Sequence, residues 1–206
     1  MENIILASGS PRRRDFFRLL GLPFTCVPSL ITETQTPSLS PAQVAEDLAR
    51  RKTSAVVEKI NSATRGQPDT PGARWVFGAD TIVVLDGEII GKARDRADAA
   101  CMLKRLAGRK HEVITAIALY SGGTKKTDCR SVSCEVEFAP LSPAEIEWYL
   151  DTGEWEGAAG SYQLQGKGGC LVKSVHGSPS NVAGLPLREF YAILRDNGYS
   201  YGALCN

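Results

Sequence analysis

A stretch near the N-terminus constrains the fold more than any other part of this chain. Residues 3–17 read NIILASGSPRRRDFF, an apolar run followed by a turn of small residues, three arginines and two phenylalanines. A short apolar run that ends at such a turn is typical of a buried strand, and Pro11 suits the first turn of a helix. The chain is therefore expected to open with a strand that passes directly into a helix.

The remaining apolar runs alternate between helical and strand periodicity. We expect helices over residues 12–21, 41–60, 95–108, 142–153 and 185–198. We expect strands over residues 3–8, 24–27, 74–91, 112–123, 130–141 and 169–175, with an interruption at 78–81 and a tight turn at Asp86-Gly87. Residues 61–73 are rich in Gly, Pro and small polar residues and predict a flexible loop. Because strand–helix units are mixed with hairpins, the pattern favours an α/β protein with a mixed sheet.

Composition limits the size and the chemistry of the protein. Its 206 residues, 43% of them hydrophobic, suit one large domain or two small lobes with a shared core. The 24 Lys and Arg residues balance 23 Asp and Glu residues, which argues against broad binding to nucleic acid. No apolar run approaches the roughly 20 residues that span a membrane, and the N-terminus lacks a signal-peptide pattern, so we expect an intracellular protein. Six cysteines without a Cys-x-x-Cys pair, and only two histidines, argue against structural zinc.

The arginines at the start of the first expected helix point to an anion. Backbone N–H groups and the helix dipole favour anions at a helix N-terminus and disfavour cations there. Arg12, Arg13 and Arg14 in that turn therefore favour a bound phosphate, whose oxygens match a guanidinium fork. The alternative is a capped helix whose basic first turn is solvated. The stretch does not match a Walker loop.

A second candidate is the sequence GADT, residues 78–81, between two apolar runs. Asp80 could hold Mg²⁺ together with substrate phosphates, or it could polarise a water molecule. It could equally be a turn residue that bonds its own backbone, and the spacing leaves these readings open. Glu33, Lys52 and Lys92, taken alone, are typical of solvated charges.

A third candidate is the glycine-rich segment GSYQLQGKGGC, residues 160–170. Glycines let a backbone approach a ligand closely, and the Gln165 amide offers a donor and an acceptor to a base edge. The alternative is a strand with a bulge and a turn. From the residues alone, the chain is expected to bind a phosphate-containing small molecule, and nothing narrower follows.

Taken in order, several segments resemble the Maf family of nucleotide pyrophosphatases: LASGSPRRRDFFRLLGLPF, ITE, LARRK, GADTIVVLDGEIIGK, AAGSYQLQGKGG and GSPSNVAGLPL. The resemblance implies a single domain over residues 1–206, with two lobes around a central cleft. It implies an α/β fold with an elongated, twisted mixed sheet, similar to the inosine-triphosphate pyrophosphatases. It further implies hydrolysis of a nucleoside triphosphate to the monophosphate and pyrophosphate with a divalent cation, Mg²⁺ or Mn²⁺, by a cytoplasmic homodimer.

Carried over by position, the resemblance assigns the chemistry to two pairs of charged residues. Glu33 and Asp80 correspond to the acidic pair that handles metal and water, with Asp80 as the proton acceptor. Lys52 and Lys92 correspond to the basic pair that faces the triphosphate.

The resemblance also assigns residues that contact the substrate. Ser10 and Arg13 correspond to phosphate ligands. Arg12, Thr81 and Gln165 match the branch of the family that takes dTTP and UTP, whereas the branch that acts on 7-methyl-GTP has Trp, Gln and Glu there. The Gln165 amide can pair with a uracil or thymine edge. The resemblance thus implies dTTP and UTP as substrates, with modified pyrimidine nucleotides as further candidates.

The chain departs from the family pattern at three positions. Thr53 replaces the usual Ala after Lys52, Ala93 replaces Pro after Lys92, and Gln163 stands where Gly is usual. These departures are expected to change loop geometry more than chemistry.

Two other functions remain open. One is a non-catalytic nucleotide-binding regulator of cell division, and the other is an inosine- or xanthosine-triphosphate pyrophosphatase. The presence of the acidic pair and both lysines argues against a non-catalytic protein.

Overall fold

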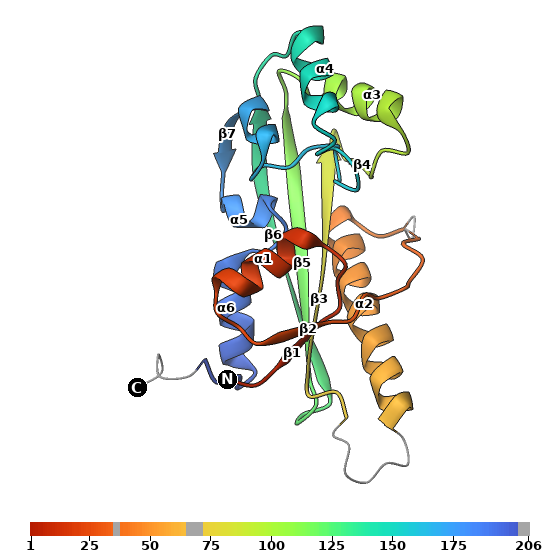
Figure 1. Cartoon of the computed structure of the whole chain (residues 1–206), viewed down its shortest axis with the longest axis vertical. Coiled ribbons are helices and arrows are strands. Elements are labelled where there is room, and N and C mark those ends of the chain that lie inside the picture. Colours follow the sequence, from red (N-terminus) through yellow and green to blue (C-terminus); the bar gives the residue numbers. More distant parts are fainter. Residues whose placement is uncertain (35–37, 65–71, 202–206) are drawn as a thin grey trace. The chain divides into compact units, whose positions relative to one another are not determined.

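The computed structural model describes residues 1–34, 38–64 and 72–201, in which helices and strands alternate (Figure 1). The helices are α1 (Pro11–Leu19), α2 (Pro41–Thr64), α3 (Arg96–Leu106), α4 (Pro143–Asp151), α5 (Pro179–Val182) and α6 (Leu187–Asp196), with a 3₁₀ helix η1 (Lys167–Leu171). The strands are β1 (Ile4–Leu6), β2 (Phe24–Cys26), β3 (Trp75–Leu85), β4 (Glu88–Ile90), β5 (Lys110–Ser121), β6 (Lys126–Phe138) and β7 (Val172–His176). Within the described ranges, no helix combines the length and the apolarity needed to cross a membrane.

The strands form a seven-stranded mixed sheet. Its order is β2-β1-β3-β5-β6-β7, and β4 pairs with β3 outside this path. β1 is parallel to both β2 and β3, whereas β4 runs antiparallel to β3, and β7 runs antiparallel to β6. A mixed sheet flanked by helices confirms the predicted fold class.

The chain divides into two compact units. Unit 1 comprises residues 1–80, 116–131 and 187–206, and unit 2 comprises residues 81–115 and 132–186. The long strands β3, β5 and β6 each supply residues to both units. The division on β3 falls between Asp80 and Thr81, so two neighbouring predicted site residues belong to different units.

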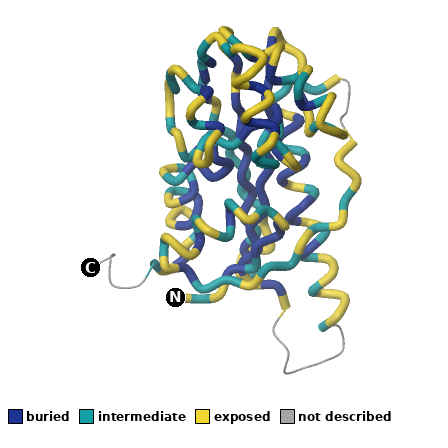
Figure 2. The backbone as a smooth tube through the Cα atoms, turned by 45° about the horizontal axis from the view of Figure 1, so that its top comes forward, coloured by how far each residue is buried: buried dark blue, intermediate teal, exposed yellow. Residues whose placement is uncertain are grey.

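In unit 1, alternating residues of β3 pack against different helices, because successive strand side chains point to opposite faces of a sheet. The Phe77 ring lies 5.6 Å from that of Phe17 on α1 and 4.9 Å from that of Phe190 on α6. Val76 instead packs in a cluster with Val56 of α2. Figure 2 shows the strands as largely buried and the outer sides of the helices as exposed. One face of β3 is therefore turned to α1 and α6, and the other to α2.

Unit 2 has an apolar core of its own, to which α3, α4 and β4 contribute. His111 lies in this core, with its ring 5.1 Å from that of Phe138 and its Nε2 atom 2.8 Å from the hydroxyl of Tyr162. Burial lowers the pKa of His111 to about 4. The imidazole is therefore neutral at pH 7 and belongs to the core.

The structure corrects three predicted boundaries. β3 runs without interruption through residues 78–81, since residues 75–80 are all buried in the sheet. Residues 61–64 belong to α2 and not to a loop, while 65–71 lie outside the described residues. Residues 167–171 form η1, so β7 begins at residue 172, and the reading of the glycine-rich segment as a bulged strand is wrong.

The predicted turn at Asp86-Gly87 is confirmed. The φ angles of 53° and 81° place both residues in the left-handed region, as a two-residue hairpin of type I′ requires. The turn sets the register of β4 on β3, with Leu85 opposite Glu88.

Candidate active site

The face of β3 that is turned to α2 positions the centre of the site. Val76, Gly78 and Asp80 share this face because strand side chains alternate. Thr53 of α2 packs against Gly78, where an added Cβ would collide with the threonine hydroxyl. One position earlier on α2, Lys52 reaches Asp80. Glycine at position 78 therefore allows the close approach of α2 that brings these two charges together.

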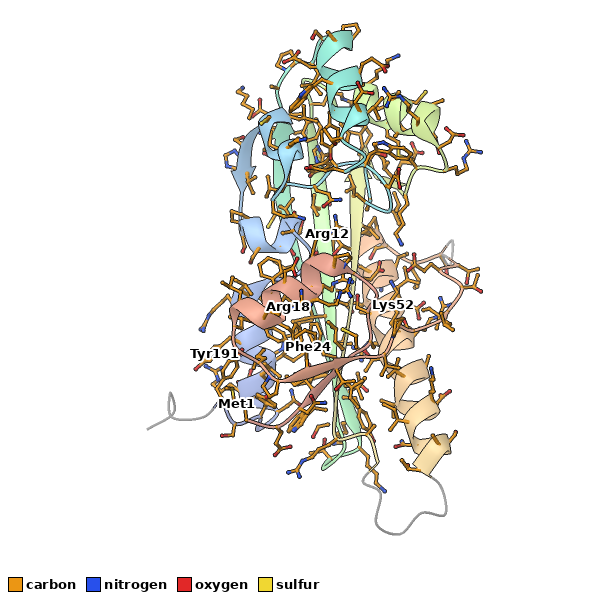
Figure 3. The ribbon with its side chains drawn as sticks, viewed as in Figure 1. Met1, Arg12, Arg18, Phe24, Lys52 and Tyr191 are labelled. Carbon is orange, nitrogen blue, oxygen red and sulfur yellow. The ribbon has the colours of Figure 1, made fainter. Side chains whose placement is uncertain are left out.

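Lys52 joins the two predicted acidic residues. Its ammonium nitrogen Nζ lies 2.5 Å from Oδ1 of Asp80 and 2.6 Å from Oε1 of Glu33. The side chains of Lys52 and Asp80 are only 11% and 9% exposed. Charges removed from water cost free energy unless they are paired, so a single ammonium group stabilises both carboxylates. Figure 3 labels Lys52 on α2.

The segment that carries Glu33 is held by Arg51, a residue that the sequence did not single out. Its Nη2 donates to the carbonyl oxygen of Thr32 at 2.7 Å, and its Nη1 donates to that of Thr34 at 3.1 Å. The same Nη1 also lies 3.2 Å from Oδ2 of Asp47. The planar guanidinium fork thus fixes the backbone on both sides of Glu33.

Arg13 on α1 is the buried member of the arginine run. It is 8% exposed, and its Nη1 donates to the Ser8 hydroxyl at 3.3 Å. Burial lowers the pKa of Arg13 to about 10. The negative charges of Asp80 and Glu33 oppose this lowering of the pKa, whereas the positive charge of Arg12 adds to it. Arg13 is therefore protonated at pH 7 and interacts electrostatically with the carboxylates of Asp80 and Glu33.

The N-terminus of α1 lies directly after the turn where the sequence predicts a helix to start. Ser10 is its N-cap, and the helix has arginines where acidic residues are usual in a first turn. The Ser10 N–H donates to the hydroxyl of Ser8 at 3.2 Å. Ser8 is 6% exposed and bonds both to this turn and to Arg13. Ser8 is not among the residues that the sequence predicts for the site, although its place in SGS, next to the arginines, is a signal for it. Figure 3 labels Arg12 on α1.

Three predicted residues, Thr81, Lys92 and Gln165, belong to unit 2. The Thr81 hydroxyl oxygen lies 3.0 Å from that of Thr115. Gln165 donates its Nε2 to Oε1 of Gln163 at 3.2 Å, and Lys92 is exposed. Arg12, Arg13, Glu33, Lys52 and Asp80 all belong to unit 1, whereas Thr81 and Gln165 of unit 2 each contact a neutral side chain.

The acidic pair fits a divalent cation. Across the parts of the chain that the structure describes, no group of three or more His, Cys, Asp or Glu side chains is arranged to hold a metal. Mg²⁺, however, needs only one or two carboxylates, because substrate phosphates and water complete its octahedron. Glu33 and Asp80 both lie within 2.6 Å of one ammonium nitrogen. Their hard oxygen donors are therefore close enough to share one cation.

Residues 3–197 match the family model described as Maf-like protein. The chain belongs to this family. It is 43% identical over 199 residues to the dTTP/UTP pyrophosphatase of Symbiobacterium thermophilum, which covers 97% of this chain and 96% of that protein. It is 40% identical over 200 residues to the dTTP/UTP pyrophosphatase of Pelotomaculum thermopropionicum, with 97% and 99% covered. Among solved structures, it is similar to the Staphylococcus aureus Ham1 protein, at 17% identity and a TM-score of 0.45 over 67% of this chain and 72% of that one.

In this Maf-like chain, hydrogen bonds accommodate two of the unusual residues. Thr53 is buried, and its hydroxyl donates to the carbonyl oxygen of Ala49 at 2.9 Å. Gln163 donates its Nε2 to the carbonyl oxygen of Glu154 at 2.6 Å, and its backbone N–H donates to the Tyr149 hydroxyl at 3.1 Å. Gln163 thus ties the segment before Gln165 to the end of α4.

Proposed function

We propose that this Maf-like protein hydrolyses dTTP and UTP to the nucleoside monophosphate and pyrophosphate. The observation that carries the proposal is the contact of Lys52 with both Glu33 and Asp80, beside the buried Arg13. Such a cluster offers cations to phosphate oxygens and carboxylates to water and metal. Relatives named dTTP/UTP pyrophosphatase, about 40% identical over nearly their full length, support it.

In this proposal the triphosphate is bound by cations and by the start of α1. Arg13, Lys52 and Lys92 neutralise phosphate oxygens, and the hydroxyl of Ser10 donates a hydrogen bond to one of them. Fixed cations stabilise the charge that develops in phosphoryl transfer without reorganising during the reaction. The bond from Arg13 to Ser8 holds the guanidinium in place before substrate arrives.

The proposed chemical step uses Asp80 as the proton acceptor. A water molecule gives its proton to the Asp80 carboxylate while its oxygen forms a bond to the α-phosphorus. The bond from that phosphorus to the bridging oxygen of the β-phosphate breaks, and pyrophosphate leaves with the electron pair. Lys52 orients the Asp80 carboxylate through its 2.5 Å contact.

Glu33 and Asp80 would hold a divalent cation, Mg²⁺ or Mn²⁺, together with phosphate oxygens. When bound, the cation supplies positive charge to the phosphates. We further propose that the protein acts in the cytoplasm as a homodimer, and that its partner is a free nucleotide and not a nucleic acid.

A nucleotide panel tests the proposal. Pyrophosphate release is measured with Mg²⁺ and with Mn²⁺ on dTTP, UTP, CTP, 7-methyl-GTP, ITP and XTP. The proposal expects the highest kcat/KM for dTTP and UTP and no release without a divalent cation. The highest value for ITP or XTP would favour a purine triphosphate pyrophosphatase. Nucleotide binding without release on any member of the panel would instead indicate a non-catalytic regulator.

A further inference from the structure

A chain of hydrogen bonds within unit 2 ends at Thr81. The hydroxyl of Thr115, on β5, donates to the backbone carbonyl oxygen of Asn181 at 2.8 Å. The Thr115 hydroxyl oxygen is also 3.0 Å from that of Thr81, on β3. Thr115 and Asn181 are both 0% exposed, so water does not compete for the bond between them. Asn181 is itself anchored, because its Nδ2 donates to the carbonyl oxygen of Val113 at 2.9 Å.

The direction of each hydrogen bond in this chain follows from its last acceptor, the carbonyl oxygen of Asn181. A carbonyl oxygen only accepts, so the single hydroxyl proton of Thr115 must point to Asn181. Thr115 has no second proton, and the bond between the two threonines therefore requires Thr81 to donate. With its own proton committed to Thr115, the Thr81 hydroxyl can act toward any ligand only as an acceptor.

We propose that Thr115 is a specificity-positioning residue, which makes Thr81 a fixed acceptor for the ring N3–H of a uracil or thymine base. The inference rests on the proposed hydrolysis of dTTP and UTP and on the resemblance that assigns Thr81 to base selection. Uracil and thymine carry a proton on N3, whereas N3 of cytosine carries a lone pair. An oxygen that can only accept pairs with the N3–H of uracil or thymine and repels the lone pair on N3 of cytosine. Because the buried carbonyl oxygen of Asn181 fixes the direction of the whole chain of hydrogen bonds, Thr81 prefers uracil and thymine nucleotides.

A purely structural role for Thr115 makes a different prediction. Removing a partner from a buried hydrogen bond lowers stability whatever the site does. That loss would change all substrates alike and leave the ratio between them unchanged. The ratio of kcat/KM for UTP to that for CTP is therefore the informative quantity.

The main test compares Thr115→Val with Thr115→Ser. Valine keeps the shape but breaks the bond, which frees the Thr81 proton to face a cytosine N3; serine keeps the bond. We expect the UTP-to-CTP ratio to fall by about tenfold in Thr115→Val and to stay within about twofold of wild type in Thr115→Ser. An unchanged ratio in a folded Thr115→Val protein, or an equal fall in both variants, would overturn the proposal.

A second measurement uses the unmodified protein, in case Thr115→Val does not fold. N3-methyl-UTP lacks the N3 proton, whereas 5-methyl-UTP keeps it and serves as the matched control. We expect the N3-methyl compound to lose at least about tenfold in kcat/KM and the 5-methyl compound to be turned over like UTP. Equal turnover of both analogues would refute the role of an acceptor at Thr81.

A failure of the proposed hydrolysis can be distinguished from a failure of the inference about Thr115. If wild-type protein releases no pyrophosphate from UTP, the hydrolysis proposal is wrong. Equilibrium binding of UTP, CTP and N3-methyl-UTP then decides the inference by the same ratios. UTP binding that exceeds N3-methyl-UTP and CTP binding supports the acceptor, and equal binding of the three contradicts it.

Discussion

The two units differ in the kind of interaction made by the residues that are assigned to nucleotide binding. In unit 1 most of the predicted residues are charged, and one buried ammonium group touches two carboxylates. In unit 2, Thr81 and Gln165 are held by neutral partners, Thr115 and Gln163. Every nucleoside triphosphate carries the same phosphates, so charge cannot tell one base from another. The comparison predicts that variants of the phosphate-facing charged residues affect all substrates alike, whereas variants at Thr81 and Gln165, or at the residues that hold them, change the ratio between substrates.

The largest effect is expected from Asp80→Asn. The amide cannot accept the proton of the attacking water, so kcat should fall by about 10³-fold or more for dTTP and UTP alike. Steady-state pyrophosphate release measures it. Asp86→Asn is the matched control, because Asp86 is exposed in the β3–β4 turn, where a positive φ suits asparagine. Near-native turnover by a folded Asp80→Asn protein would mean that another group accepts the proton.

The second largest effect is expected from Arg13→Ala. Removing a buried guanidinium that faces phosphate should lower kcat/KM by about 10- to 100-fold, by the same factor for dTTP, UTP and CTP. Arg18→Ala is the control, since Arg18 lies at the other end of α1 and pairs with Asp15 in solvent. Figure 3 labels Arg12 and Arg18 at separate positions on α1.

Arg12→Trp sharpens the same comparison within one helix. The resemblance assigns Arg12 to base selection, so this variant should change the ratio of substrates more than the affinity for phosphate. If Arg12→Trp and Arg13→Ala lowered kcat/KM for every nucleotide in parallel, the division of labour between the two arginines would be wrong.

How far the sequence predicted this site depends on how local each signal was. The strand, the SGS turn and the arginine-rich helix start lie within one stretch, and the structure confirms them. Lys52 and Glu33 looked like solvated charges, because their contact is created by the packing of α2 on β3 and by the bonds from Arg51. No spacing within the sequence encodes that contact.

At Gly78, by contrast, the sequence pattern led to a wrong prediction. A glycine beside a polar pair suggested an interruption of the strand, yet β3 is continuous there. The residue is small because α2 packs against it, which is a tertiary requirement. The role of Thr115 is not predictable from the sequence for the same reason. A threonine within an apolar strand pattern gives no sign that its hydroxyl donates to the carbonyl oxygen of a residue far away in the chain.

A smaller effect is expected from Arg51→Gln. Without the fork that holds Thr32 and Thr34, Glu33 loses its fixed position, and kcat should fall by about tenfold with little change in the UTP-to-CTP ratio. Arg50→Gln is the matched control, because Arg50 is exposed and donates a 3.5 Å bond to the carbonyl oxygen of Thr127. A changed ratio in Arg51→Gln would show that the segment around Glu33 also selects the base, which would break the comparison.

The smallest effect is expected from Gln163→Met. The carbonyl oxygen of Glu154 only accepts, so Gln163 must present Nε2 to it and Oε1 to Gln165, which in turn must donate its own Nε2. Gln163 thus fixes the order of donor and acceptor on the Gln165 amide. Methionine keeps the length of the side chain but removes this order.

Because Gln163 and Gln165 meet near solvent, we expect Gln163→Met to lower the UTP-to-CTP ratio of kcat/KM only two- to fivefold, roughly, with an unchanged kcat on UTP. Gln163→Gly, the residue usual in the family, should give the same ratio. The chain through Thr115 shares no residue with this one, so the two effects should multiply in a Thr115→Val/Gln163→Met double variant. A double variant no less selective than Thr115→Val alone would leave Thr115 as the sole positioning residue and assign Gln163 to the support of the segment after α4.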